Sequence, residues 1–194
     1  MSNRIIAIGR QTGSGGRIIG EKLAEKLGIP CYNAEVLERM AVESGVSIDF
    51  VREHFENAAS RNWLSNVLTA KEFNPSAYQD DFWAVQNKII QDLAQQGPCV
   101  FVGFCSEYIL RKHDNCLRVF IHADPQVRIK RMVEEYGEGT DAPAKRLKEQ
   151  DRRLAAYYQF YTDLKWGATE NYHITLNSGV LGIDKCVELL ASMY

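Results

Sequence analysis

The chain has 194 residues, of which 45% are hydrophobic and 25% are charged, and its formal net charge at pH 7 is −2. This length and composition suffice to bury the core of a single domain over residues 1–194, and the near-neutral charge gives no general reason to bind nucleic acid. Neither a signal peptide nor an apolar stretch long enough to span a bilayer is recognisable, so we expect a soluble cytoplasmic protein with no membrane partner.

A glycine-rich turn between an apolar strand and a helix is the stretch around which we expect the rest of the chain to be organised. Ile5, Ile6 and Ile8 are typical of a buried strand, and residues 18–27 carry apolar side chains at helical spacing. The intervening glycines let the backbone aim several N–H groups at one point, at the positive end of the helix dipole. The residues predicted to bind phosphate there are Thr12, Gly13, Ser14, Gly15, Gly16 and Arg17.

The turn departs from the usual phosphate-binding pattern, Gly-x-x-x-x-Gly-Lys-Ser/Thr. When Gly13-Ser14-Gly15 is aligned with that pattern, Arg10 takes the first glycine position, Gly16 the lysine position and Arg17 the hydroxyl position. We expect Arg17 to bring the missing cation, although a guanidinium differs from a compact ammonium and leaves the helix in another direction. The alternative is a turn that only packs a helix against a strand.

The remaining elements alternate between strands and helices. Further strands are predicted at 29–32, 99–103, 117–121 and 172–176, and further helices at 34–44, 81–96, 106–112, from Pro125, at 142–161 and at 183–193. Residues 45–80 are interpreted as a helical insert that includes a loop at 71–80, and Asp124 is expected to cap the helix that starts at Pro125. Together these elements imply an α/β three-layer sandwich with a five-stranded parallel sheet and a ligand site at the carboxyl ends of the strands.

Neither the five cysteines nor the four histidines have the paired or clustered spacing of metal ligands. The cysteines are dispersed along the chain and odd in number, which is typical of reduced, mostly buried thiols. We therefore assign no metal-ligating role to the cysteines or histidines.

Several segments together resemble the cytidylate kinase-like family, a branch of the P-loop nucleoside monophosphate kinase superfamily. They are the glycine turn, the Gly103 turn, the strand 119–121 with the arginines after it, and the segments 151–158, 165–172 and 177–183. The resemblance covers essentially the whole chain and implies a P-loop kinase-like domain with a lid over about 132–160. It also implies ATP and Mg²⁺ as cofactors, and transfer of a phosphoryl group to a nucleotide or another small phosphorylated molecule.

The resemblance further implies roles for individual residues. Phosphoryl transfer depends on positioning and on charge neutralisation. Thr12 or Ser14 is expected to assist Mg²⁺. The residues expected to act in catalysis as the lid closes are Arg17, Arg128, Arg131, Arg153 and Asp151.

The acceptor site is where the chain departs most from cytidylate kinases. Those enzymes usually read Gly-Arg-Asp after the third strand, whereas this chain reads Gly103-Phe104-Cys105, and it has Asn33 where relatives place an aspartate. The residues expected to bind the acceptor are Asn33, Glu35, Gly103 and Phe104. Because the usual charges are absent, CMP itself is not expected to be the acceptor.

Each assignment has an ordinary structural alternative. Arg128 and Arg131 could form a solvated helix face, Asp151 and Arg153 could make surface ion pairs, and Glu35 could serve only the helix dipole. Three functions therefore stay open: a kinase, a catalytically weakened nucleotide- or anion-binding pseudo-kinase, and an interaction module that uses the region of Trp63 and Trp83. The aromatic residues at 157–166 fit either the core or a dimer seam, so a homo-oligomer also stays open.

Overall fold

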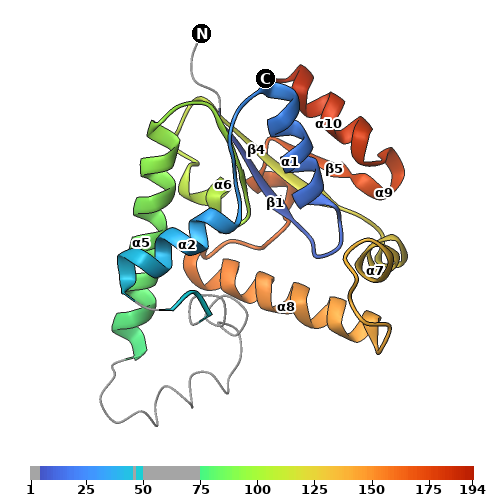
Figure 1. The fold of residues 1–194 in the computed structure, drawn as a ribbon, viewed down its shortest axis with the longest axis horizontal. Helices are drawn as coiled ribbons and strands as arrows, with labels where there is room; N and C mark the ends of the chain where they lie inside the picture. The colour runs from blue at the N-terminus through green and yellow to red at the C-terminus, as the bar shows by residue number, and fades with distance from the viewer. Residues whose placement is uncertain (1–4, 46, 50–74) are drawn as a thin grey trace.

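The computed structural model describes residues 5–45, 47–49 and 75–194 (Figure 1). Five strands form one parallel sheet in the order β2-β3-β1-β4-β5. The strands are β1 Ile5–Arg10, β2 Cys31–Tyr32, β3 Cys99–Val102, β4 Cys116–His122 and β5 Ile174–Asn177. Because β1 is the central strand, the turn that follows it lies in the middle of the carboxyl edge of the sheet.

Helices cover both faces of this sheet. The helices are α1 Gly16–Leu27, α2 Ala34–Ser44, α5 Pro75–Gln95, α6 Ser106–Ile109, α7 Pro125–Glu134, α8 Pro143–Thr162, η1 Thr169–Asn171, α9 Ser178–Leu181 and α10 Ile183–Ser192. On one face α1 and α10 pack on the sheet through Leu23 and Leu190, and on the other α2 and α5 pack through Met40 and Ile90. The predicted three-layer α/β sandwich with a five-stranded parallel sheet is confirmed.

The lid segment runs along the ligand-binding edge of the sheet. Figure 1 shows α8, drawn in orange, crossing the carboxyl ends of the strands, with α7 beside its amino-terminal end. The loop between β1 and α1 is therefore enclosed by elements that lie far from it in the sequence. No helix within the described parts of the chain is both long and apolar enough to cross a bilayer.

Two local predictions are corrected by the structure. The loop expected at 71–80 is wrong from residue 75 onward, because α5 begins at Pro75; the first turn of a helix tolerates proline, whose missing N–H has no partner there. Asp124 precedes α7, but its side chain makes no capping hydrogen bond. Its main-chain carbonyl instead accepts the first helical bond, from the Arg128 N–H at 3.1 Å. Most of the expected insert at 45–80, including Trp63, lies outside the described residues.

Candidate active site

The turn after β1 depends on glycine at two left-handed positions. Gly13 has φ +69° and Gly15 has φ +80°. A Cβ atom added at Gly13 would lie 2.7 Å from the carbonyl oxygen of Arg128, and one at Gly15 would lie 2.4 Å from Cδ1 of Ile183. Since α1 then begins at Gly16 with no side-chain cap and no acid in its first turn, its amino-terminal end favours an anion.

A cavity of about 380 Å³ opens beside this turn. Five of the six residues predicted to bind phosphate line it, namely Thr12, Gly13, Gly15, Gly16 and Arg17. Ser14 is fully buried, and its hydroxyl has no hydrogen-bond partner among the described residues. The Ser14 side chain is therefore turned away from the place where it was expected to assist Mg²⁺. We call this space the phosphate cavity.

Arg17, the expected substitute for the loop lysine, lies at the rim of the phosphate cavity. Its side chain is 57% exposed and its Nε atom lies 3.9 Å from Oε1 of Glu21. Its guanidinium carbon lies 5.5 Å from the centre of the Tyr136 ring. In this arrangement Arg17 faces Tyr136, another residue that lines the cavity.

Arg128, Arg131 and Asp151, three of the expected lid residues, meet behind the turn. Nη1 of Arg128 donates to the carbonyl oxygen of Thr12 at 3.1 Å and to Oδ2 of Asp151 at 2.6 Å, while Oδ1 of Asp151 accepts the Thr12 N–H at 3.1 Å. Arg131 donates to the carbonyl oxygen of Gly13 at 2.9 Å. The alternative of a solvated helix face is wrong for both arginines, because each is less than a tenth exposed.

Arg153 does not join this group. Its Nε atom donates to Oε1 of Glu149 at 3.2 Å, and Glu149 also accepts from Arg152. The hydrogen bonds from Arg152 and Arg153 lower the pKa of Glu149 to about 2. In the structure Arg153 therefore belongs to a surface ion pair on α8, as its structural alternative anticipated.

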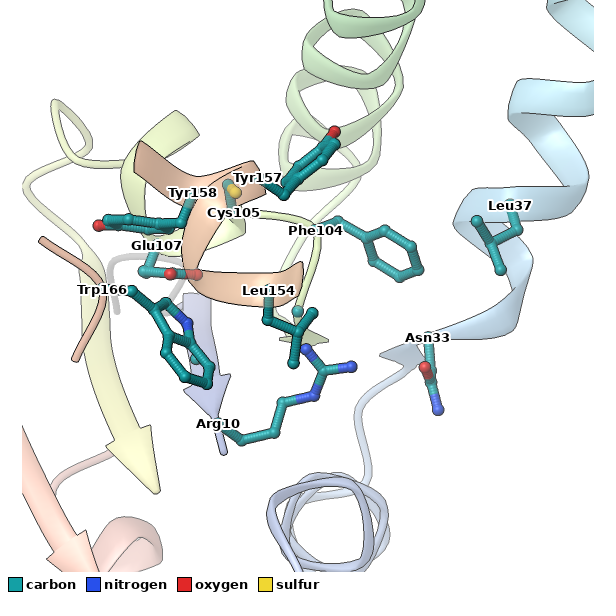
Figure 2. Close-up of a pocket in the computed structure, with 12 residues that line it drawn as sticks. Arg10, Asn33, Leu37, Phe104, Cys105, Glu107, Leu154, Tyr157, Tyr158 and Trp166 are labelled. Carbon is teal, nitrogen blue, oxygen red and sulfur yellow. The ribbon is translucent and has the colours of Figure 1, made fainter. Parts of the chain in front are cut away.

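A second cavity, of about 240 Å³, lies on the β2 and β3 side of the turn (Figure 2). Three of the four residues predicted to bind the acceptor line it: Asn33, Gly103 and Phe104. The fourth, Glu35, is paired with Arg39 at 2.9 Å and is not part of the lining. The rest of the wall is mostly aromatic or aliphatic, and includes Leu37, Leu154, Tyr157, Tyr158 and Trp166. We call this space the acceptor cavity.

A strained turn forms one wall of the acceptor cavity. Gly103, Phe104 and Cys105 have φ values of +88°, +57° and +50°, so two non-glycine residues adopt the left-handed conformation, which costs about 1–3 kcal/mol for each. Buried Gln86 on α5 holds the turn, because its Nε2 donates to the carbonyl oxygen of Phe104 at 2.6 Å. Its Oε1 in turn accepts from the hydroxyl of Tyr157 on α8 at 2.8 Å. Strain fixed in this way is typical of functional sites.

Arg10 and Glu107 are site residues that the sequence did not reveal. Arg10 lines both cavities. Glu107 lines the acceptor cavity, is 3% exposed, and its Oε2 atom has no hydrogen-bond partner among the described residues. Burial raises the pKa of Glu107 to about 7, against the opposing effect of the Arg10 guanidinium. In Figure 2 the Arg10 side chain reaches toward Leu154 and Phe104, and Glu107 appears between Tyr158 and Trp166.

A parallel sheet in this order, with a glycine turn and a helix amino terminus after its central strand, defines the P-loop kinase class of folds. Sequence comparison identifies the branch: the chain belongs to the cytidylate kinase-like family, whose profile matches residues 5–180. The cytidylate kinase of Methanococcus vannielii is 30% identical in an alignment that covers 88% of this chain and 96% of that protein. The expected family resemblance is confirmed, and membership in it makes the chain a kinase-type phosphotransferase.

Solved structures agree on the fold. An uncharacterised protein from Eubacterium ventriosum has a TM-score of 0.71 at 26% identity, with 98% of this chain and 97% of that chain covered. Shikimate kinase from Acinetobacter baumannii, solved in complex with shikimate, has a TM-score of 0.55 at 13% identity, with 100% and 93% covered. At that identity the second likeness concerns the fold alone.

Proposed function

We propose that this protein transfers the γ-phosphoryl group of ATP to a small-molecule acceptor bound in the acceptor cavity. The observation that carries the proposal is the pair of cavities that share Arg10. One is bordered by the glycine turn and the amino terminus of α1, which suits the phosphates of a nucleotide. The other is bordered by the strained turn and by aromatic side chains, which suit a small organic molecule.

The reaction is a displacement at the γ-phosphorus. An oxygen of the acceptor forms a bond to phosphorus as the bond from phosphorus to the bridging oxygen breaks, and ADP leaves with the electron pair. An acceptor hydroxyl would release its proton to solvent. The backbone N–H groups from Gly13 to Arg17 bind and orient the phosphates, and α8 excludes water from the site. Arg128, Arg131 and Asp151 hold the turn in shape through its carbonyl and N–H groups.

Mg²⁺, when bound with the nucleotide, would neutralise part of the phosphate charge. Asp151 is committed, because both of its carboxylate oxygens already accept hydrogen bonds. The lining of the phosphate cavity offers the hydroxyl of Thr12 and the carboxylate of Glu138, of which, among the described residues, only Oε2 is ion-paired, at 3.6 Å from Nε of Arg146. Oxygen donors of this kind suit Mg²⁺, which typically uses one or two protein ligands together with substrate phosphates. These two residues are therefore the ones that would hold it.

The lining of the acceptor cavity favours an acceptor with a planar or apolar body. Phe104 and Trp166 offer aromatic surface, whereas Arg10 is the single cationic side chain among the described residues of the lining. Buried Glu107, when it is ionised above its pKa of about 7, would repel a second negative charge nearby. This supports a nucleotide or another small molecule that places at most one anionic group beside Arg10. CMP is not the expected choice, since the Gly-Arg-Asp charges of cytidylate kinases are replaced here by Phe104 and Cys105.

A direct assay tests the proposed function. With ATP and Mg²⁺, we expect some members of a panel of nucleoside monophosphates and hydroxyl-bearing aromatic compounds to be phosphorylated, with stoichiometric formation of ADP. Arg17→Ala should abolish turnover if Arg17 contacts the phosphates. ATP that raises the melting temperature without phosphorylating any acceptor would instead identify a pseudo-kinase. If no nucleotide or inorganic phosphate changed the melting temperature, only the interaction module would remain.

A further inference from the structure

The aliphatic part of the Arg10 side chain packs against Gly16, the position at which the usual loop has its lysine. A Cβ atom built at Gly16 would lie 2.5 Å from Cβ and 2.9 Å from Cγ of Arg10, whereas the next nearest atom, Cβ of Ile121, would be at an ordinary 3.5 Å. Gly16 also lacks the positive φ that would itself require glycine. Arg10 is therefore what excludes a side chain at Gly16, the position at which the usual loop has its lysine.

The other end of Arg10 lies against the strained turn. A Cβ atom built at Gly103 would lie 2.5 Å from Nη1, 2.8 Å from Cζ and 3.1 Å from Nη2 of Arg10. Both ends of the side chain therefore rest on glycines, Gly16 beside the phosphate cavity and Gly103 beside the acceptor cavity. Arg10 lines both cavities, so its side chain extends from one to the other, with the guanidinium beside Gly103.

The guanidinium of Arg10 makes no polar contact that stabilises the described part of the fold. No hydrogen bond or ion pair between described residues engages its nitrogen atoms, although burial lowers the pKa of Arg10 and Glu107 is its main favourable charge. Arg128 and Arg131, in contrast, are bound to loop carbonyls. The Arg10 side chain is half-buried, so its uncommitted donors are available to a ligand that enters the cavities.

We propose that Arg10 replaces the loop lysine and is a catalytic residue that donates hydrogen bonds to the phosphoryl group as it passes from ATP to the acceptor. This rests on the proposed function. The planar fork of a guanidinium suits phosphoryl oxygens, and a flexible cationic side chain that lines both cavities can contact the group during transfer. An arginine at position 10 then requires a glycine at position 16, because a lysine there and the stem of Arg10 cannot occupy the same space.

Exchanging the two positions tests this assignment. Arg10→Gly and Arg10→Ala should each lower kcat by about 10²–10³-fold, the usual effect of removing one transition-state donor. The double variant Arg10→Gly/Gly16→Lys restores the first glycine and the lysine of the usual pattern and should regain at least about tenfold over Arg10→Gly, because a lysine in the usual position can supply the missing charge. Arg10→Ala/Gly16→Lys should not regain activity, because alanine keeps the Cβ atom that would lie 2.5 Å from the new side chain.

The controls separate chemistry from folding. Arg111→Ala removes an exposed arginine that stacks on Tyr108 outside both cavities and should leave kcat unchanged. Far-ultraviolet circular dichroism and the melting temperature report whether each variant folds. The rise in melting temperature caused by ATP and Mg²⁺ is a second readout, which should shrink in Arg10→Gly and return in Arg10→Gly/Gly16→Lys.

Two results would overturn the assignment: a folded Arg10→Gly protein with wild-type kcat, or equal activity in the two double variants. If the wild-type protein phosphorylates nothing in the panel, the proposed function fails and the thermal shift alone decides the role of Arg10. Loss of the ATP-induced shift in Arg10→Gly with recovery in the exchanged variant would then support a phosphate contact. Equal shifts in all variants would exclude one.

Discussion

Glu107 is a buried acid whose protonation is linked to folding. Desolvation raises its pKa from 4.5 to about 7, so between these values the native protein holds a proton that the unfolded chain has released. Stability therefore falls as pH rises from 4.5 to 7, and a difference of this size corresponds to about 3 kcal/mol. The neighbouring charges of Arg10 and Arg118 act against the shift but do not cancel the effect of burial.

The prediction is a pH-dependent gain of stability in Glu107→Gln. Glutamine does not ionise, so the free energy of unfolding of the variant relative to wild type should rise by about 3 kcal/mol between pH 4.5 and 7.5. Urea titrations of both proteins at several pH values measure this difference, and contributions from other groups cancel in the comparison. A difference that does not change with pH would mean that Glu107 titrates in its ordinary range.

Helices and strands could be predicted where the spacing of hydrophobic residues, or a flanking residue that interrupts regular structure, determines them. Helix α2 begins and ends as predicted, because Asn33 and Gly45 flank a periodic run. The start of α5 was missed, since a proline reads as a loop signal when its place in the helix is unknown. Glu107 carried no signal at all, because its importance comes from burial on α6. The direction of Arg10 depends on where α1 and β3 pack around it.

A prediction at the scale of elements concerns the two hydrogen bonds by which Gln86 links Tyr157 on α8 to the strained turn. Tyr157→Phe removes the hydrogen bond to Gln86 and leaves a buried amide oxygen without its partner. The expected cost is about 1–3 kcal/mol in the free energy of unfolding, measured with urea. Because Gln86 also holds the carbonyl of Phe104, acceptor KM should rise more than kcat falls. A loss of stability without any change in KM would limit these two hydrogen bonds to a structural role.

On the scale of the molecule, the carboxylate of Asp151 connects α8 to the phosphate-binding turn. Asp151 joins Arg128 on α7 to the main chain of Thr12, so three segments far apart in the sequence meet there. Twenty per cent of the Asp151 side chain is exposed, which places this pair between a surface and a buried ion pair.

Asp151→Asn tests this tie. It leaves the nearly buried guanidinium of Arg128 without its charge partner, and we expect a loss of about 2–4 kcal/mol in unfolding free energy, toward the lower end of values for buried pairs. Hydrogen exchange should quicken at the turn and in α7 together. Arg152→Gln, which breaks an exposed pair on the same helix, is the matched control and should cost clearly less than Asp151→Asn, because water screens exposed pairs. Equal losses in the two variants would show that Asp151 ties nothing together.

Because Arg10 and Gly16 are in contact, the residue types at these two positions, six residues apart, are expected to change together in evolution. A chain built in this way has room for a cation at one position or the other, and an intermediate that changed only the lysine position would meet the Arg10 stem at 2.5 Å. A search that scores each position of the loop separately would reject such a sequence twice, once for an extra arginine and once for an absent lysine. Scoring the pair jointly would retain it, and would separate relocated cations from loops that have lost theirs.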